Sequence, residues 1–165
     1  MRRAPRYAFF GLFVVLVVLH FTVRPRLGDD RLAPDLLLLA LLLYSIRSQP
    51  GPSAAAGFVV GLLRDALAPA SFGAGALAHT LVAYLGAWGK VVFFAENLLV
   101  SGWLLFAGTW LRNLVVILAS GQLQGAALWW ELGYYSTVQS LTTAAVGVAL
   151  LWPLGRWLAF RSGDA

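Results

Sequence analysis

The stretch GFVVGLLRDAL, residues 57–67, decides the fold, because it places an arginine and an aspartate side by side within an apolar run. On a helix, Gly57, Gly61 and Asp65 share one stripe, since residues four positions apart lie on the same face. Small residues at this spacing let two helix backbones approach closely in a lipid environment. The stripe therefore predicts close packing against a second helix, either of this chain or of a partner, and Asp65 should face protein rather than lipid.

The composition predicts an integral membrane protein. The chain has 165 residues, of which 60% are hydrophobic and 12% are charged, and its mean hydropathy is +0.78. One small soluble core cannot bury this much apolar surface. The net charge of +5 does not indicate a nucleic-acid-binding face, because the arginines mostly flank apolar runs. Cysteine is absent, which excludes disulfides, thiolate metal sites and cysteine nucleophiles.

Six apolar runs reach or approach the length of about 20 residues that a membrane-spanning helix requires. They occupy residues 7–23, 33–46, 53–68, 72–94, 98–119 and 136–160. Short connections rich in Gly, Pro, Asn and Ser separate them, so consecutive helices should be antiparallel neighbours. Trp and Tyr gather at about residues 125–135, which predicts an interfacial segment at the headgroup level. We expect residues 1–165 to form a single all-α transmembrane domain.

The distribution of basic residues predicts the orientation of this domain. Six spans would place both termini on one side of the membrane, which collects Arg2, Arg3, Arg6, Arg47, Lys90, Arg156 and Arg161. The opposite side collects Arg24, Arg26 and Arg31. Because basic residues are enriched on the cytoplasmic side, we expect a multi-pass protein of the bacterial inner membrane with both termini in the cytoplasm.

Asp65 needs a partner, because an aspartate within a membrane is costly unless another group binds it. Arg64 points about 100° away around the same helix and lies near its end, so we expect it to snorkel outward. His79 and Arg112 should fall at a similar depth on the two following helices. The hypothesis is therefore that Arg112 or His79 binds Asp65 across helices.

The sequence contains no convincing catalytic, metal or cofactor site. His79 and Thr80 lack an accompanying acid and an oxyanion arrangement. His20 and His79 belong to separate helices without further ligands at metal-binding spacing, and His20 is expected to be an interfacial hydrogen bonder. An ion pathway is disfavoured, because the inner half of the membrane contributes little beyond Lys90 and Glu96 at its edge. A small-molecule pocket that opens outward remains an alternative.

Three stretches follow one another in an informative order: APDLLLLALLLY, GFVVGLLRDAL and SFGAGALAHTLVAYL, with a closing helix that ends in LLWPLGRWLAFR. This order resembles the MreD family of bacterial rod shape-determining membrane proteins. In that family Pro-Asp opens the second helix, here Pro34 and Asp35. The motifs G-F-x-x-G-L-x-x-D, L-G-x-x-A-L and A-Y-L match Gly57, Phe58, Gly61, Leu62, Asp65, Gly73, Ala76, Leu77, Ala83, Tyr84 and Leu85. Arg64 departs from the family pattern, which is usually apolar there, and Phe72 stands in place of leucine.

The resemblance implies a six-helix bundle similar to the substrate-binding subunits of energy-coupling-factor vitamin transporters. It implies a non-enzymatic adaptor of the elongasome, the complex that directs peptidoglycan synthesis and rod shape. The implied partner is MreC, a single-span protein with a large extracytoplasmic domain, joined by MreB, RodA and the transpeptidase that works with RodA. The candidate structural or interface residues are Pro34, Asp35, Gly57, Phe58, Gly61, Asp65, His79, Tyr84 and Arg112.

The alternative function is a transporter subunit that binds a vitamin or another small solute. By resemblance, such a subunit should carry an alanine-rich face on its first helix, where the energising subunit docks. The first helix of this chain, YAFFGLFVVLVVLHF, is bulky instead. This difference favours the adaptor.

Overall fold

The computed structural model describes residues 6–23, 26, 28–29, 31–67, 71–93 and 98–157, and within these ranges it contains helices and no strands. The elements are α1 (Arg6–Thr22), α2 (Leu36–Arg47), α3 (Pro50–Asp65), α4 (Ala74–Phe93), α5 (Leu98–Ser120), α6 (Ala126–Trp130), the π-helical η3 (Glu131–Tyr135) and α7 (Ser136–Trp157). The predicted all-α class is confirmed. Several residues used for orientation and depth lie outside the described ranges: Arg2, Arg3, Arg24, Glu96 and Arg161.

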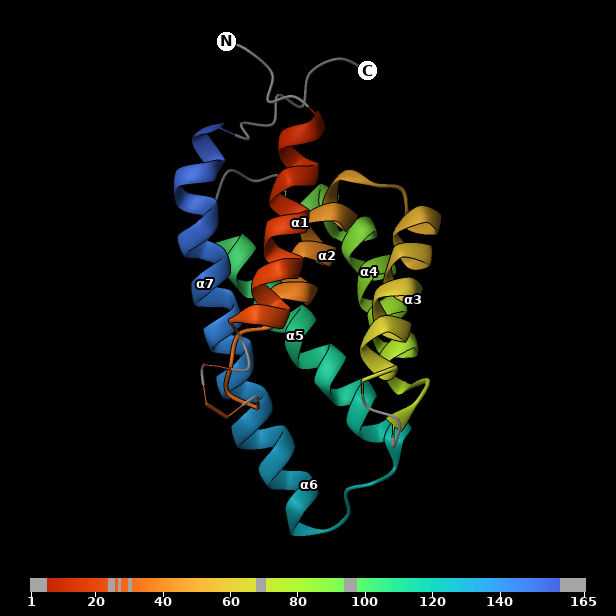
Figure 1. The fold of residues 1–165 in the computed structure, drawn as a ribbon. Coiled ribbons are helices and arrows are strands. Elements are labelled where there is room, and N and C mark those ends of the chain that lie inside the picture. The colour runs from red at the N-terminus through yellow and green to blue at the C-terminus, as the bar shows by residue number, and fades with distance from the viewer. Residues whose placement is uncertain are drawn as a thin grey trace.

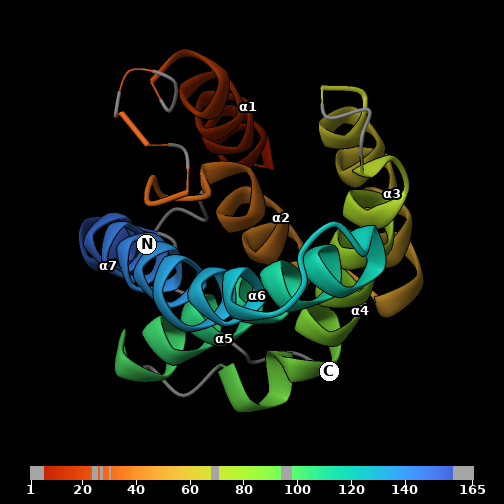
Figure 2. The ribbon, with the colours of Figure 1, turned by 90° about the horizontal axis from the view of Figure 1, so that it is seen from below.

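α2 lies inside the bundle, where it contacts α1, α3, α4, α5 and α7 (Figure 2). Its buried residues follow one another along the sequence and so cover its whole circumference: Leu36, Leu37, Leu38, Leu39, Ala40, Leu41 and Leu42. A helix buried on all sides is a core element rather than a lipid-facing one. Its 12 residues extend about 18 Å, less than the bilayer core of about 30 Å. The predicted span 33–46 is therefore an internal helix that begins within the protein.

One helix of the described residues, α5, is both long and apolar enough to cross a membrane. Residues Phe13–Thr22 of α1 and all of α2 are apolar but shorter. Large apolar side chains are nevertheless exposed over much of the surface, including Val15, Phe21, Phe58, Leu63, Trp88, Trp103 and Trp152. Soluble monomers rarely expose so much apolar surface, so this surface suits contact with lipid or with other proteins.

α3 and α4 form a tightly packed antiparallel pair (Figure 1). A Cβ atom added to Gly57 would lie 2.8 Å from the carbonyl carbon of His79 and 2.9 Å from the Cβ of Ala83. One added to Gly61 would lie 2.7 Å from the backbone nitrogen of Ala76. Such distances are below normal van der Waals contact, so only glycine fits at either position. The small-residue stripe therefore packs against α4 of the same chain, and a partner's helix does not fit there.

The last helix begins earlier than predicted. α6, η3 and α7 follow one another without a break, and Gly125, with φ of 59°, starts this helix after the α5–α6 connection. The segment 125–135 is therefore mostly a helical extension of α7 rather than a separate element, and it projects beyond the neighbouring helices (Figure 1). None of the residues in α6 or η3 is fully buried.

Candidate functional site

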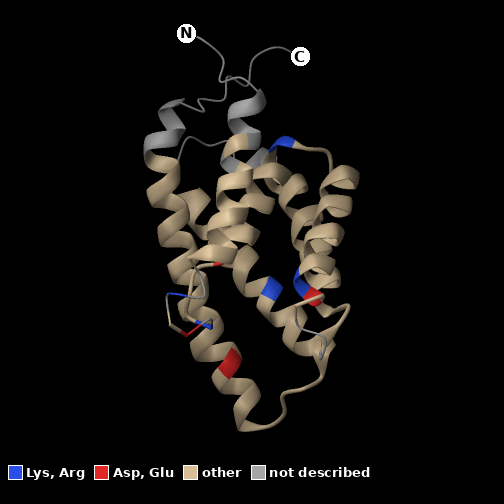
Figure 3. Ribbon diagram, in the orientation of Figure 1, with Lys and Arg blue, Asp and Glu red and all other residues tan. Residues whose placement is uncertain are grey.

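Most of the positions that Figure 3 colours as charged lie in the half of the bundle away from the two chain ends. At the centre of this region Asp35, which is fully buried, begins α2. Its Oδ1 atom accepts a hydrogen bond of 3.0 Å from the backbone N–H of Leu38, and its own N–H donates to Oγ1 of Thr143 in α7 at 2.9 Å. The first N–H groups of a helix have no partner within the helix. Asp35 therefore supplies the cap that α2 needs because it starts away from water.

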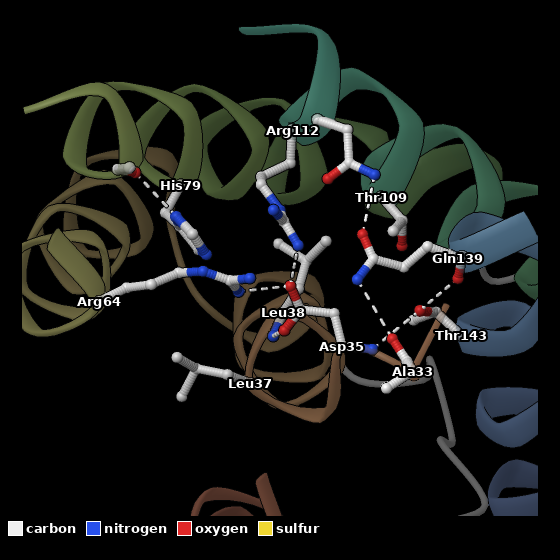
Figure 4. A network of polar contacts seen from close by, with 12 residues as sticks. Ala33, Asp35, Leu37, Leu38, Arg64, His79, Thr109, Arg112, Gln139 and Thr143 are labelled. Atoms are coloured by element: carbon white, nitrogen blue, oxygen red, sulfur yellow. Dashed lines mark hydrogen bonds and ion pairs between the residues drawn. The ribbon is translucent and has the colours of Figure 1, made fainter. Parts of the chain in front are cut away.

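Two arginines bind the same carboxylate of Asp35 (Figure 4). The Oδ2 atom accepts a hydrogen bond of 2.6 Å from Nη1 of Arg64 in α3, and it also accepts one from Nη2 of Arg112 in α5. The side chain of Arg64 is 21% exposed and that of Arg112 is 6% exposed. Charge-assisted bonds of this kind are among the stronger hydrogen bonds in proteins. Asp35 therefore joins α2, α3 and α5 through one oxygen atom.

His20 connects α1 to the same place. Its Nδ1 atom accepts a hydrogen bond of 3.2 Å from the backbone N–H of Leu37, and it lies 3.6 Å from Oδ1 of Asp35. Because Nδ1 accepts this bond, the proton of the neutral ring is on Nε2. His20 is 5% exposed, so it is a buried cap of α2 rather than the predicted interfacial hydrogen bonder.

Amide and hydroxyl side chains extend the network between α5 and α7. Asn113 donates from Nδ2 to Oε1 of Gln139 at 2.9 Å, and Gln139 donates from Nε2 to the carbonyl of Ala33 at 3.1 Å. Thr143 accepts from Asp35 and donates to the carbonyl of Gln139 at 2.7 Å. These polar groups are buried and hydrogen-bonded, as buried polar groups must be in a stable interior. The network therefore holds the start of α2 against both α5 and α7.

Asp65, which is 2% exposed, faces protein as predicted, but its partners are backbone groups. Its carboxylate accepts hydrogen bonds from the N–H groups of Gly73 at 2.9 Å, Gly75 at 2.9 Å and Ala76 at 2.8 Å. A helix N-terminus offers unpaired N–H donors and a positive dipole, which together satisfy a carboxylate without a cation. Asp65 at the end of α3 therefore caps the start of α4.

The predicted pairing of Asp65 with Arg112 or His79 is wrong. Arg112 binds Asp35, and Nδ1 of His79 donates to the carbonyl of Gly75 at 2.7 Å within α4. The expectation that Arg64 snorkels outward is wrong for the same reason, since its guanidinium turns inward to Asp35. The buried carboxylate that Arg64 and Arg112 share is that of Asp35.

The other candidate residues divide into two groups. Gly57 and Gly61 are buried between α3 and α4, His79 is buried on α4, and Pro34 is partly buried beside Asp35. Phe58 and Tyr84 point outward, with 50% and 41% of their surfaces exposed. Sequence reasoning missed the roles of Arg64 and His20, although both are ionisable groups within or beside apolar runs and so carried a signal.

The arrangement offers little for nucleophilic or metal chemistry. The hydroxyl of Thr80 donates to the carbonyl of Ala76 at 2.6 Å rather than to His79. Within the described part of the chain, no three side chains of His, Asp or Glu come together in a way that could hold a metal ion. What the geometry does show is a set of contacts that join helices.

Replacing Asp65 with alanine should lower the free energy of unfolding by about 1–3 kcal/mol, because the N–H groups at the start of α4 would lose their acceptor. Thermal unfolding of the purified chain in detergent measures this loss. The matched control is Asp29→Ala, because Asp29 is exposed and accepts a local hydrogen bond from the N–H of Arg31. Equal melting temperatures for the two variants would contradict the capping role.

Beside the network lies a pocket of about 200 Å³. Its lining comprises Arg31, Arg64, Arg112, Asn113, Val116, Ile117, Glu131, Tyr135, Ser136 and Gln139. Arg31 pairs with Glu131 at 3.4 Å and lies over the ring of Tyr135, 5.1 Å from its centroid. The pocket is thus lined by the segment that precedes α2 and by α3, α5, η3 and α7.

Comparison with known proteins identifies one family. A family model described as rod shape-determining protein MreD matches residues 1–160. This match extends well beyond residues 34–85, which carry the specific motifs in the sequence. No curated protein and no solved structure matches the chain.

Proposed function

Because this chain belongs to the MreD family of rod shape-determining membrane proteins, we propose that it is a non-enzymatic adaptor of the bacterial cell-elongation complex. In this proposal it lies in the inner membrane as a multi-pass protein with both termini in the cytoplasm. It binds MreC through helix faces, and MreB, RodA and the transpeptidase that works with RodA gather around this pair.

The observation that carries this proposal is the division of the motif residues between the interior and the surface. Gly57, Gly61 and Asp65 are explained by the packing and capping of the α3–α4 pair. Phe58 and Tyr84 belong to the same motifs but are largely exposed, so the fold itself does not explain them. Exposed aromatic side chains are enriched where proteins bind one another, which supports a partner at these outward faces.

The solute-carrier alternative is less well supported by the pocket. Pockets for small organic ligands usually have volumes of about 300–1,000 Å³ and mostly apolar linings. The pocket of this protein has a volume of about 200 Å³, and charged or polar side chains dominate its lining. A vitamin would fit poorly there. The likeness to substrate-binding subunits of energy-coupling-factor transporters remains a prediction.

Co-purification tests the adaptor. Tagged MreC, co-expressed with this chain and extracted in detergent, should retain it. Phe58→Ala and Tyr84→Ala, made separately, should each lower the retained amount by about 10-fold if the residue is an interface hot spot. The control is Trp152→Ala, because Trp152 is a 72% exposed aromatic residue on α7.

Three outcomes would contradict the proposal. The first is failure of the wild-type chain to associate with MreC. The second is an equal loss with the Trp152 control, which would indicate a general effect of removing surface aromatics. The third is strong thermal stabilisation of the chain by a vitamin, which would favour the carrier.

A further inference from the structure

The pocket beside Asp35 carries more positive than negative charge. Three arginines border it, Arg31, Arg64 and Arg112, while Glu131 lines it and Asp35 lies behind it, bound to two of the arginines. Counted over the described residues, three positive charges against two negative ones leave a net charge of +1. A net charge within a membrane protein is costly unless a counter-ion reaches it. The pocket therefore favours an anion.

Arg64 has donors available for such an anion. A guanidinium carries five N–H donors, and among the described residues the side chain of Arg64 makes one hydrogen bond, from Nη1 to Asp35. Its side chain is 21% exposed and borders the pocket. The planar arrangement of these donors matches phosphate and carboxylate oxygens in a bidentate manner. Asp35 holds the guanidinium in place, so little conformational freedom is lost when an anion binds.

The size and surroundings of the pocket narrow the class of ligand. A volume of about 200 Å³ equals that of roughly seven water molecules, which suits a phosphate-sized group and a few waters. Glu131, Tyr135 and Ser136 of the lining belong to the helix that also carries Trp129 and Trp130, which are 74% and 65% exposed. Aromatic side chains of this kind gather at the level of lipid headgroups.

We propose that this pocket binds a phosphate group, with Arg31, Arg64 and Arg112 as its cationic ligands. The phosphate belongs either to an anionic lipid headgroup or to a soluble phosphate, since both present the same oxyanion. This site goes beyond the adaptor function, because its lining includes neither Phe58 nor Tyr84, the residues proposed to meet MreC.

Two arms of one experiment distinguish the sources. In the first, the full-length chain in detergent is titrated with inorganic phosphate against chloride at equal ionic strength, and thermal stabilisation is measured. In the second, native mass spectrometry compares retention of phosphatidylglycerol with that of phosphatidylcholine. An effect in the first arm alone indicates a soluble phosphate. An effect in the second arm alone indicates a lipid headgroup, and an effect in both arms indicates that either source is accepted. Each of these results supports the proposal if the effect depends on Arg64.

Arg64→Gln should weaken binding by about 10- to 100-fold, as expected for loss of a charged hydrogen-bond donor. Arg31→Gln should have a smaller effect, because this side chain is 58% exposed and solvent screens its charge. The control is Arg26→Gln, which removes the same charge from an exposed position outside the pocket lining.

The proposal is overturned if Arg64→Gln folds and binds as tightly as wild type in both arms. It is also overturned if Arg26→Gln weakens anion binding as much as Arg64→Gln does, since anion binding would then be a general effect of surface charge. If Arg64→Gln does not fold, Arg31→Gln decides: unchanged binding in that variant overturns the proposal.

Discussion

Asp35→Asn is expected to remove most of the yield of folded protein. The substitution leaves the guanidinium groups of Arg64 and Arg112 without a carboxylate in a largely buried place. Removing one partner of a buried ion pair costs about 3–5 kcal/mol. Total folding stabilities are about 5–15 kcal/mol, so the loss is a large part of the whole. Size-exclusion chromatography of a fluorescent fusion in detergent measures the remaining monodisperse fraction.

A compensating variant separates the charge effect from other damage at Asp35. Replacing Arg64 with leucine and Arg112 with methionine in the Asp35→Asn background removes all three charges, and apolar replacements of buried ion pairs are often neutral. We expect this triple variant to recover much of the folded yield. Asp29→Asn, at an exposed loop position, should behave as wild type. Full yield from Asp35→Asn alone would show that the two arginines do not depend on Asp35.

Gly61→Val is expected to produce the second large effect. A Cβ at this position would meet the backbone of α4 at Ala76 and Gly75, which cannot move aside as a flexible side chain can. Overpacking of this kind typically costs about 1–3 kcal/mol, and contact with backbone places this case at the upper end. Separating α3 from α4 would also pull Asp65 away from its N–H donors. Thermal unfolding in detergent measures the loss.

The matched control for Gly61→Val is Gly51→Val, which adds the same β-branched side chain to the same helix. A Cβ at Gly51 would meet no atom within 4 Å, so its effect reports the conformational preference of valine before Pro52, without any contact to α4. If the two variants unfold at the same temperature, close contact between α3 and α4 does not stabilise the protein.

The α3–α4 pair shows how far the sequence could predict the structure. The spacing of Gly57, Gly61 and Asp65 correctly predicted a stripe that packs on another helix, because helical periodicity is visible in a single sequence. The partner of Asp65 was not visible. Its acceptor role depends on backbone N–H groups at the start of α4, and the turn that brings them within reach includes Gly73 with φ of 95°. A search for side-chain partners cannot find a backbone donor.

The network around Asp35 was missed for a different reason. Pro34 and Asp35 correctly marked the start of a helix, but residues 33–46 were expected to form a membrane span rather than an internal helix. The shortness of the run 33–46, well under the length of about 20 residues that a span requires, was the available signal in the sequence. Once Asp35 lies inside the protein, Arg64 and Arg112 become its nearest partners, and such a meeting of three helices cannot be derived from their sequence spacing.

Cysteine crosslinking tests most directly whether the inward motif residues hold the fold and the outward ones meet the partner. The chain contains no cysteine, so single cysteines can be introduced at Phe58, Tyr84 and the buried positions Ala78 and Ala83. Crosslinking to MreC in membranes should occur from Phe58→Cys or Tyr84→Cys and not from the buried positions. Crosslinks from Ala78→Cys or Ala83→Cys, or none from the outward positions while MreC still co-purifies, would contradict the account.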